Sequence, residues 1–130
     1  MATPELAVQA ALFDLLDGNV GAGVGVWEHP PADQPPPLVV VGESTIAPAG
    51  GKDGGLDRVE FVVSTWWSGG GRKAGLDIMD AVRALVEGAA LTDADWLLSP
   101  PVFDGAETSR LDDGDWFVGR QRFFLFAQPA

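Results

Sequence analysis

The chain contains no cysteine among its 130 residues. This absence excludes a disulfide framework, a thiolate zinc site and a cysteine nucleophile, so packing or contacts between subunits must supply the stability. No apolar run approaches the roughly 20 residues that cross a bilayer. Residues 1–14 lack the basic start and apolar stretch of a signal peptide. We therefore expect a soluble protein, made in the cytoplasm, that has no contact with a membrane.

Basic residues are also scarce. Eight Lys and Arg stand against nineteen Asp and Glu, which gives a formal net charge of −11. Binding to a nucleic-acid backbone needs clustered cations, whereas the basic residues here are scattered and Arg120 and Arg122 form a close pair. The sequence therefore disfavours nucleic-acid binding and indicates a well-solvated, acidic surface.

The apolar content is sufficient for one modest core. Hydrophobic residues make up 46% of the chain, and seven Phe and five Trp are among the residues that can fill an interior. A chain of this length commonly folds around a single core. We expect one domain spanning residues 1–130.

The clearest local pattern runs from Val59 to Gly88. Alternating apolar residues from Val59 to Trp67 predict a strand, and Gly69–Gly71 predict a turn. A helix is then expected over residues 76–86, with Gly88 as its stop. Its apolar residues recur at helical spacing: Ile78, Val82, Leu85, Val86 and Ala89.

A first helix has a readable start. Thr3 can cap it, Pro4 suits its first position, and Glu5 complements the helix dipole. The helix is expected to end at Asp17-Gly18-Asn19. One face of it is apolar: Val8, Leu12, Leu15 and Leu16, with Phe13 at the margin.

Residues 21–44 predict a strand, a loop and a second strand. Glycines alternate with apolar residues over 21–27, which indicates a short strand and does not match a dinucleotide-binding loop. The proline-rich segment Glu28–Pro37 predicts an extended surface loop. Leu38–Ser44 is almost entirely apolar, so we expect it near the centre of a sheet.

The segment Ala47–Asp57 is rich in glycine and predicts a long, flexible excursion. Gly51-Lys52-Asp53 within it lacks the upstream glycine, the following Ser or Thr and the helix of a phosphate-binding loop. No nucleotide site is therefore expected there.

The C-terminal third predicts strands. Residues 96–98 and 102–110 are short candidates, and Asp112–Asp115 indicates a hairpin turn before Trp116–Phe126. In this last strand both residue parities contain aromatic side chains. Either helices cover one face and a neighbouring subunit the other, or a bulge changes the parity.

Candidate catalytic groups are few. His29, the single histidine, is followed by Pro30 and Pro31, and no Gly-x-Ser-x-Gly elbow accompanies it. The acidic residues near the last turn do not follow the spacing of a calcium loop, and turn chemistry explains them better. We predict no catalytic, cofactor-binding or metal-binding residue and no cofactor. The acidic residues considered are Asp104, Glu107, Asp112, Asp113 and Asp115.

From Leu6 to Phe126 the order of these parts resembles the tail-completion family of long-tailed phages, prophages and gene transfer agents. The resemblance rests on the opening helix, the apolar strand ending in Gly42-Glu43, the strand ending in Trp66, and the helix over Ala74–Glu87. It implies an α+β fold in which two helices pack on one face of an antiparallel sheet of four to five strands.

The resemblance also implies a structural, non-enzymatic role in the particle at the junction of tail and head. Identical copies would form a ring, in the family usually a hexamer, that ends the tail tube and meets the head-tail connector or stopper protein. DNA would pass through the lumen without specific binding, because the acidic copies repel phosphates. The segments Glu28–Pro37 and Ala47–Asp57 would contact neighbouring rings.

A rival interpretation belongs to another class. The chain could be a small monomeric acidic binding module, or a minor enzyme of unknown substrate that uses His29 and the acidic hairpin.

Overall fold

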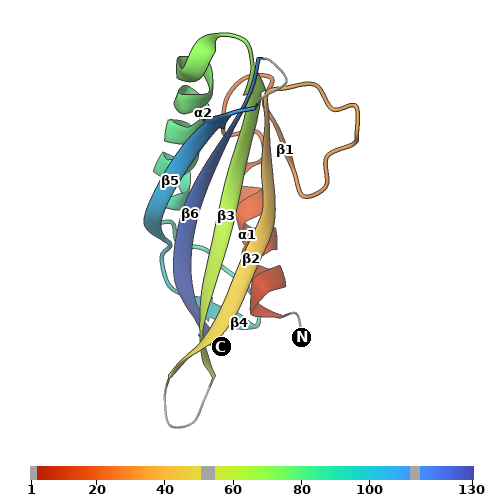
Figure 1. The fold of residues 1–130 in the computed structure, drawn as a ribbon. Coiled ribbons are helices and arrows are strands. Elements are labelled where there is room, and N and C mark those ends of the chain that lie inside the picture. The colour runs from red at the N-terminus through yellow and green to blue at the C-terminus, as the bar shows by residue number, and fades with distance from the viewer. Residues whose placement is uncertain (1–2, 51–54, 112–114) are drawn as a thin grey trace.

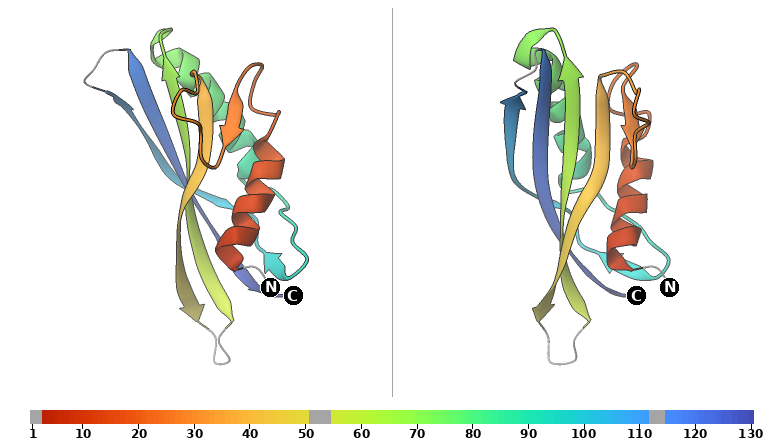
Figure 2. Two further views of the ribbon diagram at one scale, coloured as in Figure 1. Left: turned by 90° about the vertical axis from the view of Figure 1, so that its right-hand side faces the viewer. Right: turned by 45° about the vertical axis from the view of Figure 1, so that its right-hand side comes forward.

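The computed structural model describes residues 3–50, 55–111 and 115–130. In these residues two helices lie on the same side of one twisted sheet, as both views in Figure 2 show. This confirms the predicted α+β class and the packing of two helices on one face. The elements follow this order: α1 (Pro4–Leu16), β1 (Gly25–Trp27), β2 (Leu38–Gly50), β3 (Leu56–Ser68), α2 (Gly71–Val86), β4 (Trp96–Leu98), β5 (Val102–Arg110) and β6 (Trp116–Pro129).

The sheet is larger than predicted and it is mixed. Its described strands number six, in the order β1-β2-β3-β6-β4, with β5 also paired to β6 (Figure 1). β1 runs parallel to the start of β2, and the other pairs are antiparallel. The predicted central position of residues 38–44 holds only for Leu38–Val40, which lie between β1 and β3. Beyond them β2 is an edge strand within the described residues.

The predicted flexible excursion over Ala47–Asp57 is wrong for most of its described length. Ala47 pairs with Arg58 and Pro48 with Asp57, so β2 and β3 form a long hairpin that extends past the helices (Figure 1). The reason is tertiary, because β3 is held at this level by β6 on its other side. Gly51-Lys52-Asp53 lies outside the described residues.

α1 begins as predicted. The Thr3 hydroxyl oxygen accepts a hydrogen bond of 3.2 Å from the Leu6 amide, and Pro4 occupies the first turn. At the other end the Asp17 amide donates to the Phe13 carbonyl at 2.9 Å. The helix rests on the sheet through its buried residues Pro4, Ala7, Val8, Leu12 and Leu16.

α2 lies very close to the sheet at two glycines. A Cβ on Gly75 would stand 2.1 Å from the Trp67 ring, and one on Gly119 would stand 2.2 Å from the Met79 sulfur. The Trp67 indole also donates to the Gly71 carbonyl at 3.0 Å. Of the predicted apolar stripe, Val82 and Val86 are fully buried and Ile78 and Leu85 partly so, whereas the sequence pattern missed the buried Gly75 and Met79.

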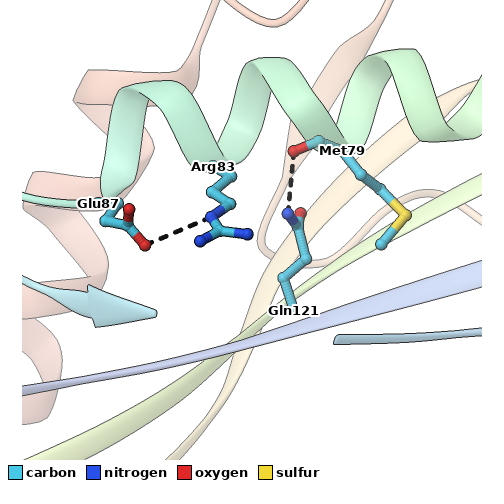
Figure 3. Close-up of polar contacts among 4 residues, drawn as sticks. All are labelled: Met79, Arg83, Glu87 and Gln121. Atoms are coloured by element: carbon cyan, nitrogen blue, oxygen red, sulfur yellow. Dashed lines mark hydrogen bonds and ion pairs between the residues drawn. The ribbon is translucent and has the colours of Figure 1, made fainter. Parts of the chain in front are cut away.

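The exposed side of α2 carries two ion pairs, each between residues one turn apart. The Arg83 Nε lies 3.3 Å from a carboxylate oxygen of Glu87, which is one turn further along the helix (Figure 3). The Arg83 guanidinium also lies 3.7 Å from the centre of the Phe103 ring, so it connects α2 to β5. Lys73 donates to Asp77 at 2.9 Å, and this hydrogen bond, with the attraction of the carboxylate, raises the pKa of Lys73.

β6 has the two different faces that its sequence indicated. Its pairing with β3 continues without a register shift from Ala127 to Trp116, so a bulge in this ladder does not explain the aromatic residues on both faces. Phe123 and Leu125 are buried beneath the helices, whereas Phe126 on the opposite face is exposed. Helices therefore cover one side of β6, and no helix covers the other among the described residues.

Candidate assembly surface

The sheet face opposite the helices, here called the helix-free face, is built by strand alternation. A bulge in β2 at Gly42 changes the parity, so Glu43 lies beside Val62 on this face instead of beneath α1. Ser44, the next residue, points the other way and donates to Glu5 of α1 at 3.1 Å. The register places these residues on the helix-free face: Leu38, Val40, Glu43, Thr45, Arg58, Glu60, Val62, Ser64, Trp66, Leu97, Val102, Glu107, Ser109, Trp116, Val118, Arg120, Arg122, Phe124 and Phe126.

Charges on the strands of this face are matched. The Arg120 guanidinium lies 3.0 Å from the Glu43 carboxylate. This ion pair joins β6 to β2, and its two residues are 77 positions apart in the sequence. Two further arginines of the face, Arg58 and Arg122, are within 3.0 Å and 3.8 Å of Glu60 and Glu107. Such exposed pairs contribute at most about 1 kcal/mol each to stability. Their main effect is to balance this face within a chain of net charge −11.

One end of the helix-free face is apolar. Leu97, Val102 and Phe126 are 54%, 47% and 37% exposed, high values for large apolar side chains. Val102 pairs with Phe124, whose ring contacts that of Phe126 edge-on at 6.0 Å. Exposed apolar side chains gathered on one face are typical of a contact surface.

The opposite end of the face meets the proline-rich segment. Residues 28–37 form the loop that the sequence predicted and contain neither helix nor strand. With the sheet they border an open groove of about 310 Å³. Its lining is almost entirely apolar: Pro30, Pro31, Gln34, Leu38, Val40, Trp66 and Trp116.

The catalytic candidates do not converge. His29 is exposed and borders an open hollow with Phe13, Asp17 and Trp27. Of the acidic candidates, Glu107 pairs with Arg122, and Asp115 lies 3.9 Å from Arg110.

The remaining acidic candidates form no cluster either. Asp104 is exposed in the β5 bulge, and Asp112 and Asp113 lie outside the described residues. Within residues 3–50, 55–111 and 115–130, no three His, Asp or Glu side chains come together as metal ligands.

Neither described helix is long and apolar enough to span a membrane. The cross-strand ion pairs were not identified from the sequence, because their partners are distant along the chain. The alternation of Arg120 and Arg122 with aromatic residues was the available signal.

These features define a small α+β protein in which one face of the sheet has no helix over it in the part of the chain that the structure describes. The model of the family described as tail completion protein gp17 matches residues 6–126, so the chain belongs to this family. This confirms the resemblance inferred from the order of the elements. Membership of this family makes the chain a structural protein of the phage tail, and thereby of the virion.

A solved structure shares the fold. One chain of the structure titled "Virion of native gene transfer agent (GTA) particle" superimposes with a TM-score of 0.84 at 23% identity. The match covers 98% of this chain and 99% of that one, so it extends over the complete set of elements. None of the curated proteins compared matches the chain.

Proposed function

We propose that identical copies of this chain form a closed ring, a hexamer, that ends the tail tube. The observation that carries this proposal is the match to the tail completion family over residues 6–126. A head-to-tail interface generates a ring when its rotation closes, and it would use two different surfaces of each copy. Exposed residues on opposite sides of the sheet, those of β2 beyond Val41 and those of β5, are available for such contacts.

The ring stops polymerisation of the tail tube and presents its other side to the head-tail connector or stopper protein. The β2–β3 hairpin supports this position because it projects beyond the helices (Figure 1). The loop 28–37 stands near the opposite end of β2. One of these two segments would contact the tube and the other the connector.

The same proposal assigns the chain no bond-breaking role, no cofactor and a single tail-completion domain over residues 1–130. Its support is the structural nature of the family and the dispersed positions of His29 and the described acidic candidates. The relative that shares the fold comes from a gene transfer agent particle. We therefore assign this chain to a phage, to a phage-like particle such as a gene transfer agent, or to a particle that a prophage encodes.

DNA passes through the ring without specific binding. The support is the net charge of −11 and the engagement of Arg58, Arg120 and Arg122 by carboxylates. Replacing acidic residues that line the lumen with Lys should slow DNA ejection, since cations bind phosphates. Glu43→Lys tests the helix-free face and Asp80→Lys tests the helix side. Unchanged ejection in both variants would contradict the proposal.

Capping of the tube can be measured directly. Purified chain added to polymerising tail-tube protein should shorten the tubes seen by electron microscopy and leave rings at one end. A variant lacking residues 50–55 is the matched test of the hairpin. If the hairpin contacts the tube or the connector, deletion of residues 50–55 should prevent either the capping of tubes or the joining of tails to heads. Tubes of unchanged length with the intact chain would disprove the capping role.

A further inference from the structure

Two strand edges on opposite sides of the sheet, one on β2 and one on β5, have no neighbouring strand in the described part of the molecule. β2 pairs with β1 only at Leu38–Val40, and from Gly42 to Gly50 its outer edge has no strand beside it. Among the described strands β5 pairs only with β6, so no strand lies beside its outer edge from Val102 to Ser109. Most residues of both edges are exposed. Open edges present rows of unpaired amide and carbonyl groups, which readily accept another strand.

We propose that in the ring the β5 edge of one copy pairs with the β2 edge of the next, which makes one continuous sheet around the assembly. This inference rests on the proposed ring and names the contact that builds it. The occupant of each edge is a second copy of this chain.

The strand directions are compatible with this contact. β2 is antiparallel to β3, β3 to β6, and β6 to β5, so β5 runs antiparallel to β2. All copies in a cyclic ring share one orientation along the axis. The β5 strand of a neighbour therefore arrives antiparallel to β2, and the alternation of strand directions continues from copy to copy.

The position of β1 fixes the register. Following the pairs across the sheet, Val41 is level with Val63, Gln121 and Ala106. A neighbour without stagger would bring residues 107–109 against Leu38–Val40, the positions that β1 already occupies. Strands in closed sheets tilt by about 35–45°, which shifts the register by roughly 1 to 1.5 residues per strand and by about four to six residues over four strands. A shift of this size toward Gly50 clears β1.

With that stagger, residues 106–110 of the neighbour oppose residues 42–46. Thr45 then faces Glu107, and both lie on the helix-free face, so side-chain alternation is preserved across the contact. The two irregular points of the edges also coincide. Pro48, which lacks an amide donor, falls opposite the β5 bulge at Asp104 and Gly105. The ladder is therefore bounded by β1 on one side and by this pair of irregularities on the other.

The absence of cysteine makes the contact directly testable. In a double variant Thr45→Cys/Glu107→Cys, the two sites of one copy are separated by β3 and β6 and lie at different levels of the sheet, so they are more than about 14 Å apart at ordinary strand spacing. A disulfide needs Cα atoms within about 7 Å, so any disulfide joins two copies. Mild oxidation should give a ladder of covalent oligomers on a non-reducing gel, ending at the ring. Thr45→Cys/Ala84→Cys, with its second site on the exposed side of α2, is the control for random collisions.

Hydrogen exchange on the unmodified chain gives a second readout that requires no variant. Within 42–46 and 106–110, the amides that point away from β3 and β6 should exchange rapidly in the monomer and become protected on assembly, whereas the inward-pointing amides of the same strands are already paired. Light scattering on the same samples separates the two proposals. Rings that form with control-level crosslinking and no added protection overturn the edge pairing and leave the ring intact. A chain that stays monomeric at every concentration, with or without tube protein, overturns both.

Discussion

The side chain of Gln121 in β6 donates a hydrogen bond of 2.9 Å to the main-chain carbonyl of Met79 in α2 (Figure 3). Gln121 is only 3% exposed, so this is a polar contact in an otherwise apolar layer. Its amide oxygen has no hydrogen-bond partner among the described residues, and neither has the hydroxyl of the buried Thr65. α2 is thus attached to the sheet by a polar group that is only partly satisfied.

Two substitutions of Gln121 should show how far its hydrogen bond to Met79 stabilises the fold and how far its buried, unpartnered oxygen destabilises it. Gln121→Met keeps the length of the side chain and removes the unpartnered oxygen, so the free energy of unfolding should stay within about 1 kcal/mol of the unmodified chain. Gln121→Glu should lower it by about 2 kcal/mol at neutral pH, because an unpaired carboxylate is poorly tolerated in the interior. Urea unfolding followed by circular dichroism measures both.

The Gln121→Glu variant should also respond to pH in a defined direction. Burial raises the pKa of the introduced carboxyl above its unfolded value of about 4.3. The destabilisation is therefore present above the folded pKa and is lost as the pH falls, since the protonated group is neutral and can donate to Met79. A pH-independent loss of stability would show that this site is open to water.

Gly75→Ala should destabilise the chain by about 2 kcal/mol. The new Cβ would overlap the rigid Trp67 ring, and such overpacking outweighs the roughly 1 kcal/mol by which Ala improves helix propensity. Gly119→Ala is the matched control, because its clash is with the flexible Met79 side chain and should cost less. Denaturant unfolding of both variants tests this order. Equal losses would mean that Trp67 moves as easily as Met79.

Arg83→Met should lower the free energy of unfolding by about 1 kcal/mol, mainly through loss of the guanidinium above the Phe103 ring. Glu87→Gln should cost only a few tenths, because the Arg83–Glu87 pair is about half exposed. Comparing the two by thermal or urea unfolding identifies the dominant contact of Arg83. If both substitutions cost the same, the ion pair and not the ring is that contact.

Thr3→Ala should remove about 1 kcal/mol of stability, since the Leu6 amide loses its capping acceptor. Thr3→Asp preserves an acceptor and adds a negative charge at the positive end of α1, so it should match or exceed the unmodified chain. Far-UV circular dichroism during urea unfolding is the appropriate measurement. Indistinguishable Ala and Asp variants would show that the cap contributes nothing.

The parts of the fold that depend on local chemistry were predictable. The start of α1 follows from Thr3 and Pro4, which satisfy or avoid the unpaired amides of a first turn. The stripe around Val82 and Val86 correctly oriented α2. Gly75 escaped notice because a glycine contributes nothing to a hydrophobic pattern, although here its missing side chain is what allows the helix to approach Trp67.

The parts that depend on distant partners were not predictable. The end of β2 contains Pro48 and Gly50 and is a weak strand former. The start of β3 is held by its ladder with residues 123–127 of β6, and β2 pairs with β3 at this level. The parallel contact between β1 and β2 is likewise a product of the long loop that joins them. The helix-free face could not be drawn from the sequence, because the bulge at Gly42 reverses the alternation of β2.

The matched charges of the helix-free face have a consequence for a ring in which this face surrounds the channel. A guanidinium such as Arg120, already held by Glu43, has little to gain from a phosphate. Few ions would be displaced from a passing duplex, and no attractive well would slow it. DNA would then slide along the inner wall because each cation there is neutralised by a neighbouring carboxylate. A strong negative potential in the channel would not be required.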